Sequence, residues 1–216
     1  PHQTRPLRSH LRLGAVQELM AASKDGTQIG GLLIQPVDYQ AGKKYPTILR
    51  IHGGPVSQHQ DEFDFQFQLL AANGYAVVAM NPRGSSGRGE KFATAIYADW
   101  GNKDVQDVLA GVNYAVAQGI ADPERLGIGG WSYGGILTNY TIASDTRFKA
   151  ATSGASTSDI QTGYDTCIDQ LDFQTKTGAT WKTSDFISIT TYPFTPSPSS
   201  LPPRLLPRRL PVPILP

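Results

Sequence analysis

Apolar segments alternate with helical segments along the middle of the chain, and this alternation restricts the fold more than any other feature. Short apolar runs predict strands over residues 47–51, 75–80, 125–130 and 149–152. Helices are predicted between them, around residues 62–72, 102–118 and 136–143. Strands joined through single helices run parallel, because each crossover returns the chain to the same end of the sheet. The sequence therefore predicts an α/β fold with a doubly wound, mostly parallel sheet.

A β-hairpin is predicted in front of this alternation. Two stretches with apolar residues, 16–22 and 29–34, flank the turn Lys24-Asp25-Gly26-Thr27. The dipeptide Asp-Gly is a strong hairpin signal, since both positions tolerate the backbone angles of a tight turn.

The composition changes abruptly after residue 193. Nine of the 16 prolines lie in the last 24 residues, which contain no Gly, Asp, Glu or Lys. Proline has a fixed φ and lacks an N–H donor, so neither a helix nor ladder pairing in a sheet is expected there. Three interpretations are open: a disordered tail, a polyproline-type ligand or linker, and a translated frameshift near residues 194–200.

Charge and special residues exclude several classes of protein. A net charge of +1 gives no reason to expect nucleic acid or a membrane surface as partner, and no apolar run approaches the length of a membrane span. The single Cys167 excludes an internal disulfide, and the four histidines lack metal-ligand spacing. No dinucleotide or P-loop motif occurs, so neither a cofactor nor a metal is expected. The first residues lack a Met and a signal-peptide core, so we expect a cut start, which leaves the compartment open.

The segment Gly130-Trp131-Ser132-Tyr133-Gly134 matches the nucleophile elbow G-x-S-x-G. It lies between a predicted strand and a predicted helix, which is the context that this motif requires. Ser132 is therefore predicted to be a nucleophile with strained backbone angles and an exposed hydroxyl. The N–H of Tyr133 is predicted to bind the oxyanion of the reaction. The alternative is a glycine-rich turn in which the serine is idle.

A second oxyanion donor is predicted in His52-Gly53-Gly54-Pro55, which follows the 47–51 strand. The fold of this motif places its second donor at such a position, and we assign it to Gly54. His52 does not fit as the catalytic base, because the triad order of this fold is Ser, then Asp or Glu, then His. We interpret His52 as a structural residue that braces its loop. Asp104 and Asp107 precede the serine, and we interpret them as the solvated start of a helix rather than a catalytic pair.

Five motifs together carry a family resemblance. They are Lys24-Asp25-Gly26-Thr27, His52-Gly53-Gly54-Pro55, Asn81-Pro82-Arg83-Gly84-Ser85-Ser86-Gly87, Asp122-Pro123-Glu124-Arg125 and Gly130-Trp131-Ser132-Tyr133-Gly134-Gly135. In this order, over residues 15–193, the chain resembles the prolyl oligopeptidase family of serine peptidases, in its acylaminoacyl-peptidase and dipeptidyl-peptidase branch. The resemblance implies an α/β-hydrolase that cleaves short peptides with Ser132 as the nucleophile and with Tyr133 and Gly54 as oxyanion donors. It also implies a β-propeller in front of this domain in the parent protein.

The sequence departs from this family after residue 193. No histidine follows residue 59, and Asp185 cannot be matched to the acid of the family's triad. We therefore expect a linker remnant over 1–15, a partial peptidase domain over 16–193 and a disordered or frameshifted tail over 194–216. The sheet should be incomplete at its C-terminal end, and the chain should be inactive or nearly so. The alternatives are an esterase or lipase of the same fold and a degenerate hydrolase module that only binds.

Overall fold

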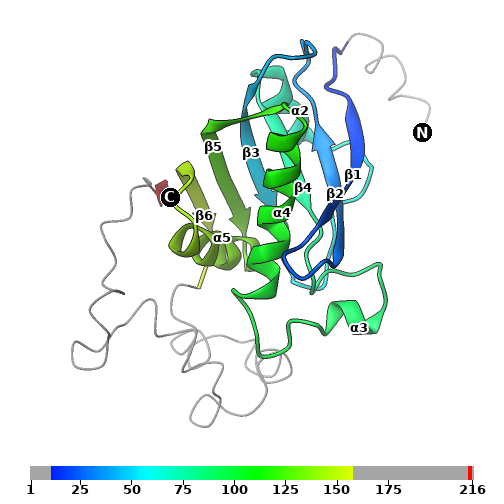
Figure 1. Cartoon of the computed structure of the whole chain (residues 1–216), viewed down its shortest axis with the longest axis vertical. Coiled ribbons are helices and arrows are strands. Elements are labelled where there is room, and N and C mark those ends of the chain that lie inside the picture. The colour runs from blue at the N-terminus through cyan, green and yellow to red at the C-terminus, as the bar shows by residue number, and fades with distance from the viewer. Residues whose placement is uncertain (1–10, 158–213, 216) are drawn as a thin grey trace.

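A mixed seven-stranded sheet runs through the part of the chain that the computed structural model describes, residues 11–157 and 214–215 (Figure 1). Its strands in chain order are β1 Val16–Ala22, β2 Gln28–Ile34, β3 Tyr45–Ile51, β4 Ala76–Met80, β5 Ala121–Trp131, β6 Phe148–Gly154 and β7 Ile214–Leu215. Across the sheet the order is β1-β2-β4-β3-β5-β6-β7. The hairpin strands β1 and β2 pair antiparallel with each other, and β2 pairs antiparallel with β4. From β4 to β7 all neighbours are parallel.

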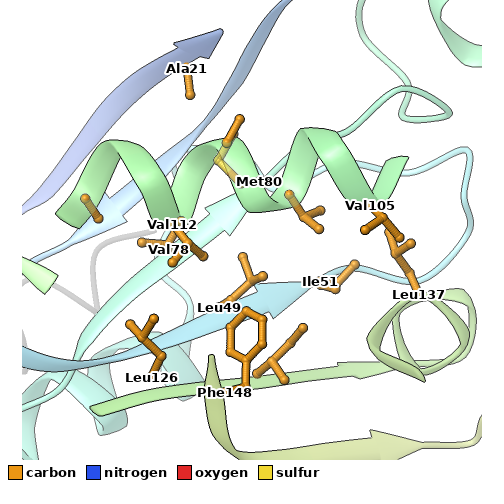
Figure 2. Close-up of a cluster of buried hydrophobic side chains, with 14 of the residues drawn as sticks. Ala21, Leu49, Ile51, Val78, Met80, Val105, Val112, Leu126, Leu137 and Phe148 are labelled. Carbon is orange, nitrogen blue, oxygen red and sulfur yellow. The ribbon is translucent and has the colours of Figure 1, made fainter. Parts of the chain in front are cut away.

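Helices cover both faces of the sheet. α2 Phe65–Ala72 covers one face, and α4 Lys103–Ala117 and α5 Tyr133–Ser144 cover the other, while the single-turn α3 Glu90–Ala93 buries none of its residues. Successive residues of a strand point to opposite faces, and β4 shows the two sides clearly. Its Val78 and Met80 belong to the large core with α4 and α5, whereas Val77 and Ala79 pack with α2. Figure 2 shows part of the larger core, where Val112 of α4 lies near Val78 and Val105 lies near Leu137 of α5.

The hairpin, the parallel strands and the three long helices confirm the predicted elements to within a few residues. The main difference lies at the start of β5. The sequence predicts this strand over residues 125–130, with Asp122-Pro123 as a break in front of it, but β5 already begins at Ala121, which pairs with Tyr45. The next pair is Thr47 with Leu126, so the intervening residues bulge out of the ladder. The single-turn helix α3 was not predicted, because four residues give no periodicity.

The proline-rich tail differs from its prediction at two positions. Ile214 and Leu215 pair in parallel with Ala151 and Thr152 of β6, so the expectation that these residues form no ladder is wrong. Both residues lie between prolines but keep their own N–H donors, which permits a short pairing. The rest of the tail, together with Cys167 and Asp185, lies outside the described residues. The division of the chain into three segments therefore stays a prediction, as does an incomplete C-terminal edge of the sheet.

None of the helices in the described ranges is both long enough and apolar enough to cross a lipid bilayer.

Candidate active site

Ser132 lies at a sharp turn between β5 and α5. Its φ of 58° and ψ of −124° fall in a region that residues other than glycine rarely adopt. The residue is exposed to solvent. Its N–H donates to the Gly154 carbonyl at 3.0 Å, and its own carbonyl accepts from the N–H groups of Gly135 and Ile136. The structure confirms the predicted strand-to-helix turn, its strained backbone and the exposure of the serine.

The two glycines of the motif are required by backbone contacts around this turn. A Cβ on Gly134 would lie 2.3 Å from the Ile51 carbonyl oxygen and 2.8 Å from the His52 carbonyl oxygen. A Cβ on Gly130 would lie 2.4 Å from backbone atoms of Gly134. The first turn of α5 therefore crosses directly over the end of β3. A side chain on Gly134 would push α5 away from β3, and one on Gly130 would push β5 away from α5.

The loop after β3 lies against Ser132. The Cβ position of Gly53 is 3.5 Å from the Ser132 Cβ and 4.0 Å from its Oγ. Because β3 and β5 are neighbouring parallel strands, their carboxyl ends meet at the same edge of the sheet. Gly54 follows one residue further along this loop, with a φ of 126°. Tyr133 is the first residue of α5, so its N–H has no acceptor within the helix. That the Tyr133 and Gly54 N–H groups converge on one oxygen stays a prediction.

His52 braces this loop. Its ring is buried, with Nδ1 2.7 Å from the Gly53 carbonyl oxygen and Nε2 2.9 Å from the Ser85 Oγ. Burial lowers the pKa of His52, so the neutral ring is favoured. Since a carbonyl only accepts, Nδ1 carries the proton, and Nε2 accepts the Ser85 hydroxyl. Both ring nitrogens are thus engaged in holding the loop, in agreement with the predicted structural role of His52.

The interpretation of Asp104 and Asp107 as a solvated helix start is wrong. Both side chains are fully buried. Asp104 accepts the Tyr133 hydroxyl at 2.5 Å and the N–H groups of Gly101 and Val105 at 2.9 Å. Asp107 accepts hydrogen bonds from the Nε and Nη2 atoms of Arg83, at 2.9 and 2.7 Å. The reason is that the first turns of α4 face the start of α5 and the loop after β4 rather than water. The sequence held one weak signal of this for Asp104 alone, which lies four residues before Val108 and so borders the apolar stripe of α4.

The surroundings of Asp104 perturb its titration. Burial raises the pKa of Asp104 to about 6, although the hydrogen bonds from Tyr133, Gly101 and Val105 act in the opposite direction. Burial, followed by the negative charge of Asp104, raises the pKa of Tyr133 well above its ordinary value. Tyr133 therefore stays protonated, and its hydroxyl donates a hydrogen bond to Asp104.

Within residues 11–157 and 214–215, no three side chains of His, Cys, Asp or Glu are grouped closely enough to hold a metal ion.

The sequence model of the prolyl oligopeptidase family matches residues 61–193. The chain belongs to this family of serine peptidases. It is 43% identical over 143 residues to an uncharacterized peptidase, YuxL, of Bacillus subtilis (strain 168), a match that covers 66% of this chain and 22% of the relative. It is 39% identical over 140 residues to dipeptidyl peptidase 8 of Mus musculus, with 62% of this chain and 16% of the relative covered. The chain thus spans about a fifth of the length of these relatives.

Solved structures show the same fold. The uncomplexed acylaminoacyl peptidase of Pyrococcus horikoshii matches with a TM-score of 0.82 and 30% identity, over 90% of this chain and 32% of that one. An acylaminoacyl peptidase in complex with Z-Gly-Gly-Phe-chloromethyl ketone matches with a TM-score of 0.81 and 30% identity, over 88% of this chain and 31% of that one. These matches confirm the predicted α/β-hydrolase fold and the predicted family.

Proposed function

We propose that this chain is the nucleophile-bearing part of a serine peptidase that hydrolyses short peptides. One observation carries the proposal: Ser132 is exposed on a left-handed turn, with the Cβ position of Gly53 4.0 Å from its Oγ. A strained turn of this kind persists only where the surrounding structure holds it, and such turns cluster at active sites. The similarity to acylaminoacyl and dipeptidyl peptidases supports a short peptide as the substrate.

In the proposed reaction, a base takes the proton of the Ser132 hydroxyl, to be passed later to the leaving amine, and the Oγ forms a bond to the carbonyl carbon of the scissile peptide. The carbonyl oxygen then becomes an oxyanion, which the N–H groups of Tyr133 and Gly54 stabilise. The N-terminal end of α5 adds a favourable dipole at the same place. As the intermediate collapses, the C–N bond breaks and the amine leaves with a proton. Water then releases the acyl group from Ser132.

The proton of Ser132 needs a base within about 2.6–3.2 Å, or one water away. All four histidines of this sequence precede Ser132. His52 uses both ring nitrogens on Gly53 and Ser85, and the ring of His59 packs between His52 and Phe67. We therefore propose that this chain by itself shows no more than trace hydrolysis. The loss of triad residues lowers kcat by on the order of 10⁶ in a serine protease.

In the parent protein, we propose a β-propeller in front of this domain that restricts access to small substrates. This proposal rests on the family resemblance and on the short share of the relatives' length that this chain covers.

The test compares the purified chain with its Ser132→Ala variant on peptide p-nitroanilides and short esters. We expect trace turnover at most, and any turnover that is present should be lost in Ser132→Ala. Ser132-dependent peptide cleavage within a hundredfold of an ordinary serine peptidase would show that a base has been overlooked. Cleavage of esters with none of peptides would favour the esterase alternative.

A further inference from the structure

The first two turns of α4 contact the segments on both sides of Ser132. On one side, the buried Asp104 binds the hydroxyl of Tyr133, the residue that follows the serine. The same carboxylate binds the Gly101 N–H through both oxygens, at 2.9 and 3.1 Å, which ties it to the chain entering α4. The ring of Trp100 packs edge-on against Tyr133 at 5.1 Å. Tyr133 is therefore held through its side chain as well as through its helix.

On the other side, the buried Asp107 holds the loop after β4. It accepts the backbone N–H of Arg83 as well as two nitrogens of its guanidinium group. Arg83 also pairs with Asp25 in the hairpin turn, and Ser23 donates to Asp107 at 2.5 Å. The side chain of Arg83 is 8% exposed. Charged side chains are seldom buried to this extent unless they are paired. The pairing of Arg83 with Asp107 therefore fixes the loop close to the end of β4.

The loop after β4 in turn supports the loop that touches Ser132. Ser85 is fully buried and binds the ring of His52. Next to it, the Ser86 N–H donates to the Ser57 carbonyl at 2.9 Å. Asn81 exchanges two hydrogen bonds with the backbone of His59, at 2.7 and 2.9 Å. Three separate contacts thus join the two loops, and Asp107 anchors both through Arg83.

We propose that Asp104 and Asp107 are positioning residues that together hold the two arms of the oxyanion site, Tyr133 and the Gly53–Gly54 loop, in register around Ser132. The inference rests on the proposed function. An oxyanion is stabilised only when its donors lie about 3 Å from one point, and such placement has to be held within about 0.5 Å. One rigid helical turn that binds both arms satisfies this requirement, because the two carboxylates are only three residues apart.

The charges around the two acids set the conditions for a test. Asp104 faces Tyr133 on α5 and Asp107 on its own helix, while Asp107 faces Arg83 and, through it, Asp25. Burial raises the pKa of Asp104 to about 6. Measurements between pH 7 and 10 therefore keep Asp104 mostly ionised.

A thiol at position 132 reports on the donors without any need for a catalytic base. Cys167 is the only native cysteine, so Ser132→Cys in a Cys167→Ser background leaves one thiol. Its pKa is measured from the rate of iodoacetamide alkylation against pH. Donors and a helix N-terminus favour the thiolate, so we expect a thiol pKa below the usual value of about 8.5.

Asp104→Asn and Asp107→Asn are then introduced into this background one at a time. If they position the donors, each should raise the thiol pKa by about 0.5–1 unit, because displaced donors stabilise the thiolate less. If they only stabilise the fold, the removal of a nearby negative charge should lower the thiol pKa or leave it unchanged. The direction of the shift therefore separates a positioning role from a structural one.

Three further variants serve as controls. Asp145→Asn removes a carboxylate that pairs with Arg147 just after α5, away from Ser132, and should leave the thiol pKa unchanged. Tyr133→Phe removes the partner of Asp104 without a change of charge, and Ser85→Ala removes the support of His52. These two milder variants decide the question if Asp104→Asn or Asp107→Asn fails to fold by circular dichroism, since each should also raise the thiol pKa.

The outcomes distinguish this inference from the proposed function. An ordinary thiol pKa in the Ser132→Cys background would count against the oxyanion site itself. A lowered thiol pKa that neither acid variant nor its milder counterpart raises would overturn the positioning role alone.

Discussion

The close approach of α5 to β3 makes Gly134→Ala a sharp test of the nucleophile elbow. An added Cβ would lie 2.3 Å from the Ile51 carbonyl oxygen and 2.8 Å from that of His52, both backbone atoms at the carboxyl end of β3. Ordinary contacts between carbon and oxygen are about 1 Å longer, so one segment has to move by about that distance. Overpacking of a dense core costs about 1–3 kcal/mol, and a rigid backbone neighbour favours the upper end.

Three kcal/mol corresponds to a fall in Tm of about 6–12 °C for a domain of this size. Differential scanning fluorimetry or calorimetry measures this shift directly. Gly30→Ala is the matched control, because its Cβ would meet only the Met20 Sδ at 3.4 Å. This control should change stability by no more than about 1 kcal/mol, and in the stabilising direction if at all. Equal Tm values for Gly134→Ala and Gly30→Ala would refute the steric account of the motif.

Two further predictions concern buried ionisable groups. Burial and the neighbouring His52 lower the pKa of His59 to about 3, against 6.5 when unfolded, so the unfolded state binds one more proton between these values. Stability should therefore fall with acidification below pH 6.5, and the loss attributable to His59 between pH 7 and 5 should be about 2 kcal/mol. Urea titrations at both pH values check this, and an equal loss in His59→Asn would contradict it. Arg83→Met leaves the buried Asp107 uncompensated and should cost about 3–5 kcal/mol by urea denaturation. The exposed Arg125→Met should hardly move the midpoint, and similar costs for both would argue against the network around Arg83.

Much of the fold could be predicted because its signals are local. The periodicity of residues 102–118 and the Asp-Gly turn each depend on neighbours within a few positions, and α4 and the β1–β2 hairpin follow them closely. Ser132 could be placed for the same reason, since its strained turn needs only glycines two residues away on each side. The bulge at the start of β5 was missed because Asp122-Pro123 resembles a break unless the partner strand is known.

The roles of Asp104 and Asp107 could not be predicted from the sequence. Their partners lie 29 residues away at Tyr133 and 24 residues away at Arg83. An acid near the start of a helix commonly faces water and interacts favourably with the helix dipole. The local pattern therefore pointed to exposed side chains for both acids. The bond between His52 and Ser85 spans 33 residues and is equally invisible to a local pattern.

The sequence by itself determined the order of strands and helices along the chain, the family and the position of the nucleophile. Periodicity and short motifs suffice for this, because they set the local path of the backbone. Only the tertiary structure decided which loops meet at Ser132 and which charges are buried. A helical period specifies which residues share a face, but not which element that face meets. Which element a helix face meets depends on the packing of the whole sheet. For this reason Asp104 and Asp107, at the start of α4, are buried hydrogen-bond acceptors rather than solvated charges.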